Sequence, residues 1–375
     1  MRRRLCTVAD ATVGLLRCGE VGPSFQDLKV LTSALPPQPV SLAMLQSSAR
    51  DRSAKTRLLN AQFLRRELTT RRAHALSLLR SMPSPLAEQP AVAQLADVYW
   101  QRLRGLLELP PIVCEADERD FAARMAAQNA LIQKQTPDEF MMCVDALGAC
   151  RKGDERLPAQ QQLEIDRQLD ALFLARIGMR CLLEHYVASE NPVEGFAGVI
   201  DRRCSPVALC EAVAAQTVER LRAEYGDAPR VEVLTGRAGI GSDQTFSFVP
   251  SHFTYVLRTL LENSCVATLR HHHRQQRPAA AASAAGVAAA GTDSSTAVPM
   301  MSDASGKASG GGNGTGAGSI PPVRVVVAVS EGLVQLKLVD EAGGIRRSSL
   351  ANVWSYRALD SKWWKPQDGL SLPVR

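Results

Sequence analysis

Apolar residues recur every three or four positions through the first half of the chain, as they do along amphipathic helices. The stretches with this spacing cover about residues 58–79, 95–107, 116–149 and 159–188. The breaker Met82-Pro-Ser-Pro85 separates the first two stretches. Because four antiparallel helices with short joints bury such stripes most simply, the pattern predicts a helical bundle.

Shorter patterns follow the bundle. A last helix is predicted over residues 205–224, where Pro206 suits the first turn, and it leads into a second region. Strands are predicted at Val231–Leu234, Thr245–Val249, Val323–Val329 and Leu333–Val339. A further helix opens at Pro250. The predicted fold class is therefore α plus α/β, with a bundle domain over residues 56–225 and a second domain over residues 226–375.

Two segments of the chain have the composition of unstructured chain. Residues 274–319 are alanine runs followed by a glycine run, and they cannot bury enough apolar surface to order themselves. We bound this low-complexity insertion at residues 271–319. Its glycine run, residues 310–318, lacks the lysine and Ser/Thr that end a phosphate-binding loop. Residues 1–55 are interpreted as a leader and linker, because Pro36-Pro-Gln-Pro39 excludes a helix there.

The start of the chain has the composition of a mitochondrial transit peptide. Three arginines and no acid occupy the first nine residues, and apolar Leu5, Val8 and Val13 stand among and after them. A disordered basic tail is the alternative, because Asp10 and Glu20 interrupt the pattern. We expect the leader to direct import and to be removed.

Composition narrows the class of protein. With 375 residues, 45% of them hydrophobic, the chain can bury the cores of two domains. The net charge of +6 is modest, and the positive charges are scattered, which argues against a nucleic-acid partner. Nine cysteines without a CxxC pair indicate reduced thiols inside a cell, and no metal site is recognisable in them. No apolar run approaches the roughly 20 residues that span a bilayer, so we expect no membrane span.

Two polar residues occupy positions that suit a nucleotide. Asn263 lies within the otherwise apolar helical run 253–268, where its amide oxygen can meet a hard cation such as Mg²⁺. Asp340 ends a strand and enters the glycine-bearing turn 340–345. There its carboxylate can accept from an exocyclic amine, while the turn lets backbone approach a ligand closely.

In this order, the two motifs resemble the N box and the first glycine box of the GHKL ATPase superfamily, which includes gyrase, histidine kinases and mitochondrial protein kinases. Three upstream segments narrow the resemblance. They are Phe63-Leu-Arg-Arg-Glu-Leu68 with Arg71 and Arg72, Arg176-Ile-Gly-Met-Arg-Cys-Leu-Leu-Glu-His185, and Tyr225-Gly-Asp-Ala-Pro-Arg-Val231. Over roughly residues 60–370 the chain thus resembles the mitochondrial 2-oxoacid dehydrogenase kinases, the family of pyruvate and branched-chain 2-oxoacid dehydrogenase kinases. Within the family, the segment 225–231 is more similar to the branched-chain type of kinase.

The resemblance implies a helical bundle followed by a Bergerat-type (GHKL) ATP-binding α/β sandwich. It implies an ATP-dependent protein-serine kinase that phosphorylates the E1 component of a 2-oxoacid dehydrogenase complex in the mitochondrial matrix. The implied cofactors are ATP and Mg²⁺. The implied partners are E1, the lipoyl domain of E2 and a second copy of the chain in a homodimer.

The resemblance also assigns roles to residues of the second domain. Asn263 would hold Mg²⁺, and Asp340 would meet the adenine. The other residues expected to bind the nucleotide or to shape its phosphate pocket are Val266, Gly343, Gly344 and Gly369.

Three features of the sequence lie outside that nucleotide site. Arg176 and Arg180 stand one helical turn apart and can clamp a carboxylate together. In the family, the matching arginines line a bundle pocket for a 2-oxoacid-like regulator, whereas a solvated helix face is the alternative interpretation. His185, on the same helical stretch, is expected to be a packed core residue rather than a catalyst. The run His271-His-His273 is attributed to low complexity rather than to metal binding.

The sequence departs from the family pattern at several positions. Thr259 stands where the family has the glutamate that acts as the base. Glu262 cannot substitute, because one residue along a helix turns the side chain by about 100°. Ala342 replaces a family glycine and is expected to resist a left-handed turn. The sequence stops at Arg375, before the elements that follow the second glycine box in the family. Gln367 and Ser371 replace glycines of that box. These features predict a truncated sequence or impaired nucleotide handling.

Two alternatives to an active kinase follow from these departures. One is a catalytically impaired pseudokinase that binds and regulates the complex as a scaffold. The other is a helical scaffold with a vestigial second domain, which would bind no ATP.

Overall fold

The computed structural model describes residues 25–151, 158–235, 245–288, 319–330, 333–353 and 355–356. The chain divides into two compact units. The first comprises Met1–Arg203, Ser247–Pro250 and Arg346–Arg375, and the second comprises Cys204–Phe246 and Ser251–Ile345. The predicted transit peptide, like Gly369 of the predicted phosphate pocket, lies outside the described residues.

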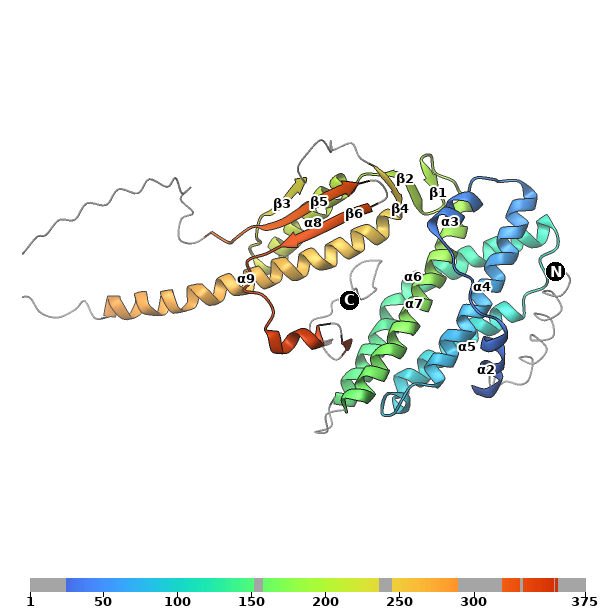
Figure 1. Ribbon diagram of the computed structural model, residues 1–375, viewed down its shortest axis with the longest axis horizontal. Coiled ribbons are helices and arrows are strands. Elements are labelled where there is room, and N and C mark those ends of the chain that lie inside the picture. The colour runs from blue at the N-terminus through green and yellow to red at the C-terminus, as the bar shows by residue number, and fades with distance from the viewer. Residues whose placement is uncertain are drawn as a thin grey trace, which may run out of the picture. The chain divides into compact units, whose positions relative to one another are not determined.

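Long helices dominate the first unit (Figure 1). They are α4 (Ala54–Arg80), α5 (Pro90–Leu107), α6 (Glu115–Arg151) and α7 (Ala159–Glu190), with the short 3-10 helix η1 (Leu86–Glu88) between α4 and α5. The hydroxyl of Ser53 accepts from the amide of Thr56 at the start of α4, and Pro90 opens α5, as helix starts favour. The helices that the apolar spacing predicted are confirmed.

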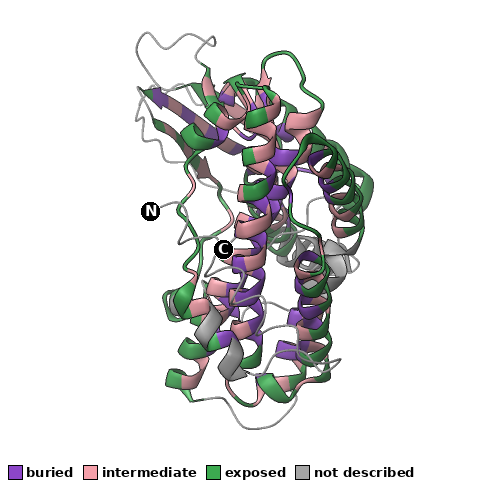
Figure 2. Ribbon diagram, turned by 90° about the vertical axis from the view of Figure 1, so that its right-hand side faces the viewer, coloured by how far each residue is buried: buried purple, intermediate pink, exposed green. Residues whose placement is uncertain are grey.

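The core of the bundle is formed by the apolar stripes of these helices. Leu68 and Leu76 of α4, Leu103 of α5 and Ile165 of α7 are fully buried. Figure 2 shows the buried positions as bands along the long helices. Since burying one such side chain contributes roughly 1.5–3 kcal/mol, the bundle is stabilised chiefly by these stripes.

Residues 25–48 form two short helices, α2 (Phe25–Ala34) and α3 (Leu42–Ser48). Leu28 of α2 is fully buried and Leu45 of α3 is buried, and both belong to the core cluster of the bundle. This part of the predicted linker is therefore packed structure, although residues 36–39 are not helical, as predicted. Helices this short are marginal alone and depend on packing, which explains why the sequence signal was weak.

The second unit contains a three-stranded sheet in the order β3-β5-β6. Strand β3 (Val231–Thr235) runs parallel to β5 (Val323–Ser330), and β5 runs antiparallel to β6 (Leu333–Val339). Val325 lies opposite Val233 on one side and Leu338 on the other. These strands match the predicted ones, and Asp340 directly follows the last of them.

Two helices accompany this sheet. Helix α8 (Pro206–Tyr225) packs against β3, and helix α9 (Pro250–Ala288) begins where the sequence predicted. An ion pair between Arg220 and Glu262 joins the two helices. Helix α9 continues to Ala288, into the insertion predicted to be unstructured, because alanine has the highest helix propensity. None of the described helices is long and apolar enough to cross a membrane.

A second, smaller sheet has the order β1-β2-β4. Its strands are β1 (Phe196–Ala197), β2 (Ile200–Cys204) and β4 (Phe246–Phe248). Strands β1 and β2 were not predicted, because β1 is too short for a pattern and β2 carries three consecutive charged residues, 201–203.

The division into units differs from the predicted boundary at residues 225 and 226 in two places. Helix α8 belongs to the second unit, whereas the chain from Arg346 onward belongs to the first unit. This returning segment includes the 3-10 helix η2 (Arg347–Asn352) and buried Tyr356. The Tyr356 hydroxyl donates to Asp170 of α7 at 3.0 Å, which anchors the segment on the bundle.

Candidate functional site

Helix α9 has an exposed face centred on Asn263. The exposed positions recur every three or four residues and are Val256, Leu260, Asn263, Ala267 and Arg270. The opposite face carries Leu257, Leu261 and Cys265, all fully buried. The amide of Asn263 therefore faces outward, where a ligand can reach it.

The turn after β6 has a defined backbone shape. Asp340 is exposed, and its Oδ1 accepts from the amide of Ala342 at 3.2 Å. Gly343 and Gly344 have φ angles of +83° and +73°, in the left-handed region that glycine adopts without strain. The left-handed conformations found in this turn are those of the two glycines. The Asp340 carboxylate keeps acceptor sites for a further donor.

The turn is held from two sides. On the strand side, Arg324 of β5 reaches Glu341 at 3.7 Å and Glu232 of β3 at 3.4 Å. On the helix side, Gly343 lies against His271 of α9: a Cβ built on this glycine would stand 3.0 Å from the imidazole Cε1. The turn 340–344 therefore lies beside the helix that carries Asn263.

The electrostatics of Cys265 supports the same neighbourhood. Burial first, and then the negative charges of Glu262 and Asp340, together raise the pKa of this thiol to about 12. Asp340 is therefore within electrostatic range of Cys265, which lies only two residues beyond Asn263 on α9. The structure therefore places Asp340 and the two turn glycines beside α9, the helix that carries Asn263.

The position expected for a catalytic base has no carboxylate directed to this face. Thr259 is half-buried, and its hydroxyl donates to the carbonyl of Tyr255 in its own helix at 3.0 Å. Glu262 is buried and paired with Arg220 of α8, so its carboxylate points away from the Asn263 face, as helix geometry predicted. Val266, the other residue expected to contact the nucleotide, is half-buried beside that face.

A small cavity in the bundle gathers arginines. Arg176 and Arg180 are only 7% and 8% exposed, so the alternative of a solvated helix face is wrong. The cavity has a volume of about 40 Å³. Its lining comes from four helices and comprises Leu68, Arg72, Tyr99, Arg102, Asn129, Ile132, Arg176, Met179, Arg180 and Leu183. Guanidinium groups bind carboxylates through paired hydrogen bonds, so a cavity lined by four arginines suits a small anion.

Protein groups bind some of these arginines. Arg180 donates to Glu184 at 2.7 Å, one turn further along α7. Arg72 donates to the carbonyl of Arg102 at 2.6 Å and to the side chain of Gln128 at 3.0 Å. These bonds fix the guanidinium groups in place around the cavity, which pre-organises it for a carboxylate.

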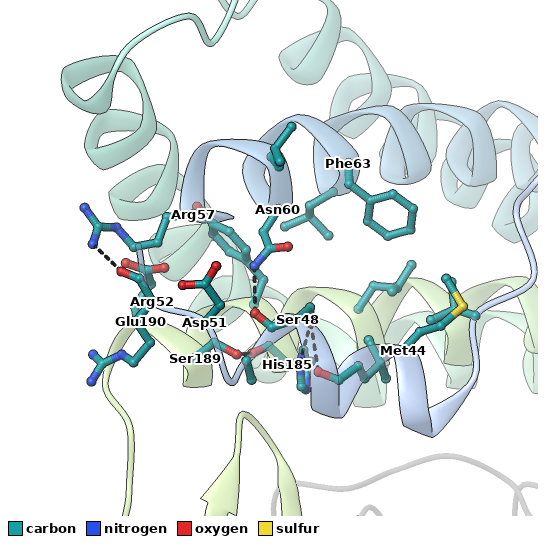
Figure 3. A pocket seen from close by; sticks show the side chains of 17 residues that line it. Met44, Ser48, Asp51, Arg52, Arg57, Asn60, Phe63, His185, Ser189 and Glu190 are labelled. Atoms are coloured by element: carbon teal, nitrogen blue, oxygen red, sulfur yellow. Dashed lines mark hydrogen bonds between the residues drawn. The ribbon is translucent and has the colours of Figure 1, made fainter. Parts of the chain in front are cut away.

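A larger cavity of about 290 Å³ lies between α3, the start of α4 and the end of α7 (Figure 3). Its apolar lining includes Leu45, Phe63 and Leu182, while charged side chains such as Arg57 and Glu190 stand at one end. The sequence interpretation missed this cavity, because it treated the residues before α4 as a linker. Apolar positions in α3 were the available signal.

His185 forms part of the wall of this larger cavity. Its Nε2 lies 3.4 Å from the hydroxyl of Ser48, and Asn60 donates to the carbonyl of Ser48 at 3.0 Å. Burial lowers the pKa of His185, and a hydrogen bond with the Leu45 carbonyl opposes part of that shift. The side chain is only 4% exposed, which agrees with the expected packed histidine.

Comparison with known proteins connects these features to a family. Residues 39–201 match a family model described as mitochondrial branched-chain alpha-ketoacid dehydrogenase kinase. A mitochondrial pyruvate dehydrogenase (acetyl-transferring) kinase of Arabidopsis thaliana is 26% identical over 319 residues, covering 84% of this chain and 73% of the relative. The corresponding kinase of Schizosaccharomyces pombe is 28% identical over 192 residues, covering 50% of this chain and 34% of the relative. The mitochondrial pyruvate dehydrogenase (acetyl-transferring) kinase 2 of Saccharomyces cerevisiae is 25% identical over 247 residues, covering 63% of this chain and 48% of the relative.

A helical bundle and a small α/β unit, with a glycine turn beside the helix that carries Asn263, agree with the predicted α plus α/β class. The chain is similar to the mitochondrial 2-oxoacid dehydrogenase kinases, and its family-model match covers residues 39–201. The alignments span between about one third and three quarters of the lengths of these relatives.

Proposed function

We propose that this chain is an ATP-dependent protein kinase that phosphorylates a serine of the E1 component of a 2-oxoacid dehydrogenase complex in the mitochondrial matrix. The observation that carries the proposal is the turn Asp340–Gly344, which Arg324 contacts through Glu341 and which lies against α9, the helix that carries Asn263. The relatives named as mitochondrial kinases of pyruvate dehydrogenase support the same function.

The residues of the turn and of α9 offer the chemical groups that bind Mg-ATP. Asn263 offers an amide oxygen, the type of ligand that Mg²⁺ prefers. Asp340 offers an acceptor for the adenine amine, and Gly343 and Gly344 allow backbone to approach the phosphates. When bound with ATP, Mg²⁺ neutralises charge on the phosphates. Val266 and Gly369 complete the proposed nucleotide contacts.

Thr259 limits the chemistry of this site. A positioned general base contributes about 100- to 10,000-fold to a rate, and a hydroxyl bonded to its own helix cannot take that role. We therefore propose slow transfer. The second candidate function, a catalytically impaired pseudokinase that regulates the complex as a scaffold, is favoured by this same observation.

Calorimetry with Mg-ATP and phosphate transfer to E1 distinguish the candidates. Asp340→Ala should abolish Mg-ATP binding, because it removes the acceptor for the adenine amine. Thr259→Glu should raise the transfer rate, by about 100-fold or more if the rest of the site is competent. His273→Glu, which adds the same charge at an exposed position of α9 outside the Asn263 face, serves as the control and should change nothing.

Two results would contradict parts of the proposal. Rapid transfer by the wild-type protein with no gain from Thr259→Glu would show that the base lies elsewhere. A protein that binds no ATP in either form would leave the scaffold as the function.

The bundle supports the partners in the same proposal. The arginine cavity suits the carboxylate of a 2-oxoacid-like regulator, because Arg176 and Arg180 are buried and line it. The cavity of about 290 Å³ has an apolar lining that suits an extended apolar arm, such as a lipoyl-lysine of E2. A homodimer is also proposed, and sedimentation of the purified protein measures it.

A further inference from the structure

His271 of α9 touches the turn on which the proposed nucleotide site depends. A Cβ built on Gly343 would stand 3.0 Å from Cε1 and 3.2 Å from Nδ1 of this imidazole. Gly343 also has a φ of +83°. The imidazole thus occupies space that a side chain at residue 343 would need, so the histidine and the glycine fit each other at van der Waals contact.

The imidazole is held from its other side. The side-chain nitrogen of Gln275, one helical turn further along α9, lies 2.9 Å from His271 Nε2. With Gln275 as the donor, Nε2 accepts, and the ring proton is on Nδ1, one of the atoms nearest the turn. His271 is therefore a fixed contact between α9 and the turn.

The other two histidines of the run are placed differently. His273 is exposed, and two residues along a helix rotate its side chain by about 200° from that of His271. His272 lies with its ring centroid 6.3 Å from that of His273. The run that the sequence interpretation attributed to low complexity therefore supplies, in His271, one residue with a specific contact.

The position of His271 relative to Asn263 indicates which part of a ligand it influences. The two residues are eight positions apart on α9, which is about 12 Å along the axis. Asn263 is the proposed Mg²⁺ ligand, so His271 itself lies apart from the proposed Mg²⁺ position. It contacts the turn whose first residue, Asp340, is the proposed acceptor for the base.

We propose that His271 is a positioning residue for purine recognition: by holding Gly343, it fixes the turn that presents Asp340 to the 6-amino group of the base. Arg324 of β5 contacts the same turn through its ion pair with Glu341. Removal of the His271 side chain therefore leaves this ion pair and removes the contact with Gly343. This inference rests on the proposed nucleotide site and adds a determinant of base specificity to it.

Calorimetric affinities for Mg-ATP and Mg-ITP test the inference, because inosine triphosphate carries an oxygen in place of the 6-amino group. His271→Ala should weaken ATP binding by about tenfold, the size of one lost interaction, and ITP binding by less than about twofold. His271→Phe keeps a flat ring against Gly343 and should restore most of the ATP affinity. His273→Ala is the matched control and should leave both affinities unchanged.

Hydrogen exchange at the amides of residues 341–344 gives a second measurement that needs no nucleotide. Exchange there should be faster in His271→Ala than in the wild type or in His273→Ala. Unchanged exchange would overturn the inference, and so would equal weakening of ATP and ITP. A wild-type protein that binds neither nucleotide would overturn the proposed function itself. Wild-type binding of ATP that does not change in His271→Ala would overturn only the inference about His271.

Discussion

The bundle and the second unit present candidate sites of opposite kinds. In the bundle, Arg176 and Arg180 are 7% and 8% exposed, and several helices contribute to the cavity around them. In the second unit, Asn263 and Asp340 are exposed, and the site depends on the backbone of one short turn. The first site is built by side-chain packing, and the second by local backbone geometry.

This difference indicates where each site is sensitive to change. A packed site depends on many buried positions at once, and the family-model match over residues 39–201 coincides with that packed region. A turn depends on a few residues, such as Gly343 and its neighbour His271. The proposed nucleotide face can therefore diverge at Thr259 while the bundle keeps its architecture.

The largest expected effects come from the two cores. Leu68→Ala in α4 and Leu257→Ala in α9 remove fully buried side chains, so each should lower the free energy of unfolding by about 2–5 kcal/mol. Hydrogen exchange in urea should show lost protection mainly within the mutated unit. Leu174→Ala, at a position 67% exposed, is the control. If Leu257→Ala exposed the bundle amides equally, the two units would not be independent.

An intermediate effect is expected at the arginine cavity. Arg176→Met should weaken binding of pyruvate or of a branched-chain 2-oxoacid by at least about tenfold, because a charge-assisted hydrogen bond contributes roughly 1.5–3 kcal/mol. Arg167→Met removes a guanidinium from the same helix at a side chain 68% exposed, and should have no effect. Calorimetry with both acids measures the change. Equal affinities in the two variants would show that the regulator binds elsewhere.

The smallest effect concerns pH and is confined to the bundle. Burial lowers the pKa of His185 below 6.5, so the folded state favours the neutral imidazole. The unfolded state then binds the proton more readily than the folded state. The free energy of unfolding of the bundle should therefore fall as the pH drops through the pKa of this histidine in the unfolded state, near 6.5. His185→Gln should flatten the dependence of the urea midpoint between about pH 7.5 and 5.5. A variant that keeps the full slope would assign the effect to other groups.

The helices and strands could largely be predicted from sequence. The apolar spacing located α4 to α7 within a few residues of their ends, because period 3.6 and length are properties of the chain itself. The same holds for β5 and β6 and for the placement of Asp340 directly after them. The exposure of Asn263 also follows from periodicity, since it is polar within an apolar helix.

Short helices and side-chain environments could not be predicted in this way. Helices α2 and α3 form where the sequence suggested a linker, since their stability comes from burying Leu28 and Leu45 on the bundle. The spacing of Arg176 and Arg180 allowed both a solvated face and a clamp. Only the packing of neighbouring helices decided that both are buried.

The sequence by itself determined the order of the elements, the family motifs and the loss of a carboxylate at Thr259, because each of these is a property of residues close in the chain. The tertiary structure decided the contact between His271 and Gly343, which are 72 residues apart in the sequence. It also decided the burial of the arginines. Such contacts depend on which surfaces meet when distant segments pack, and no local pattern of residues specifies that.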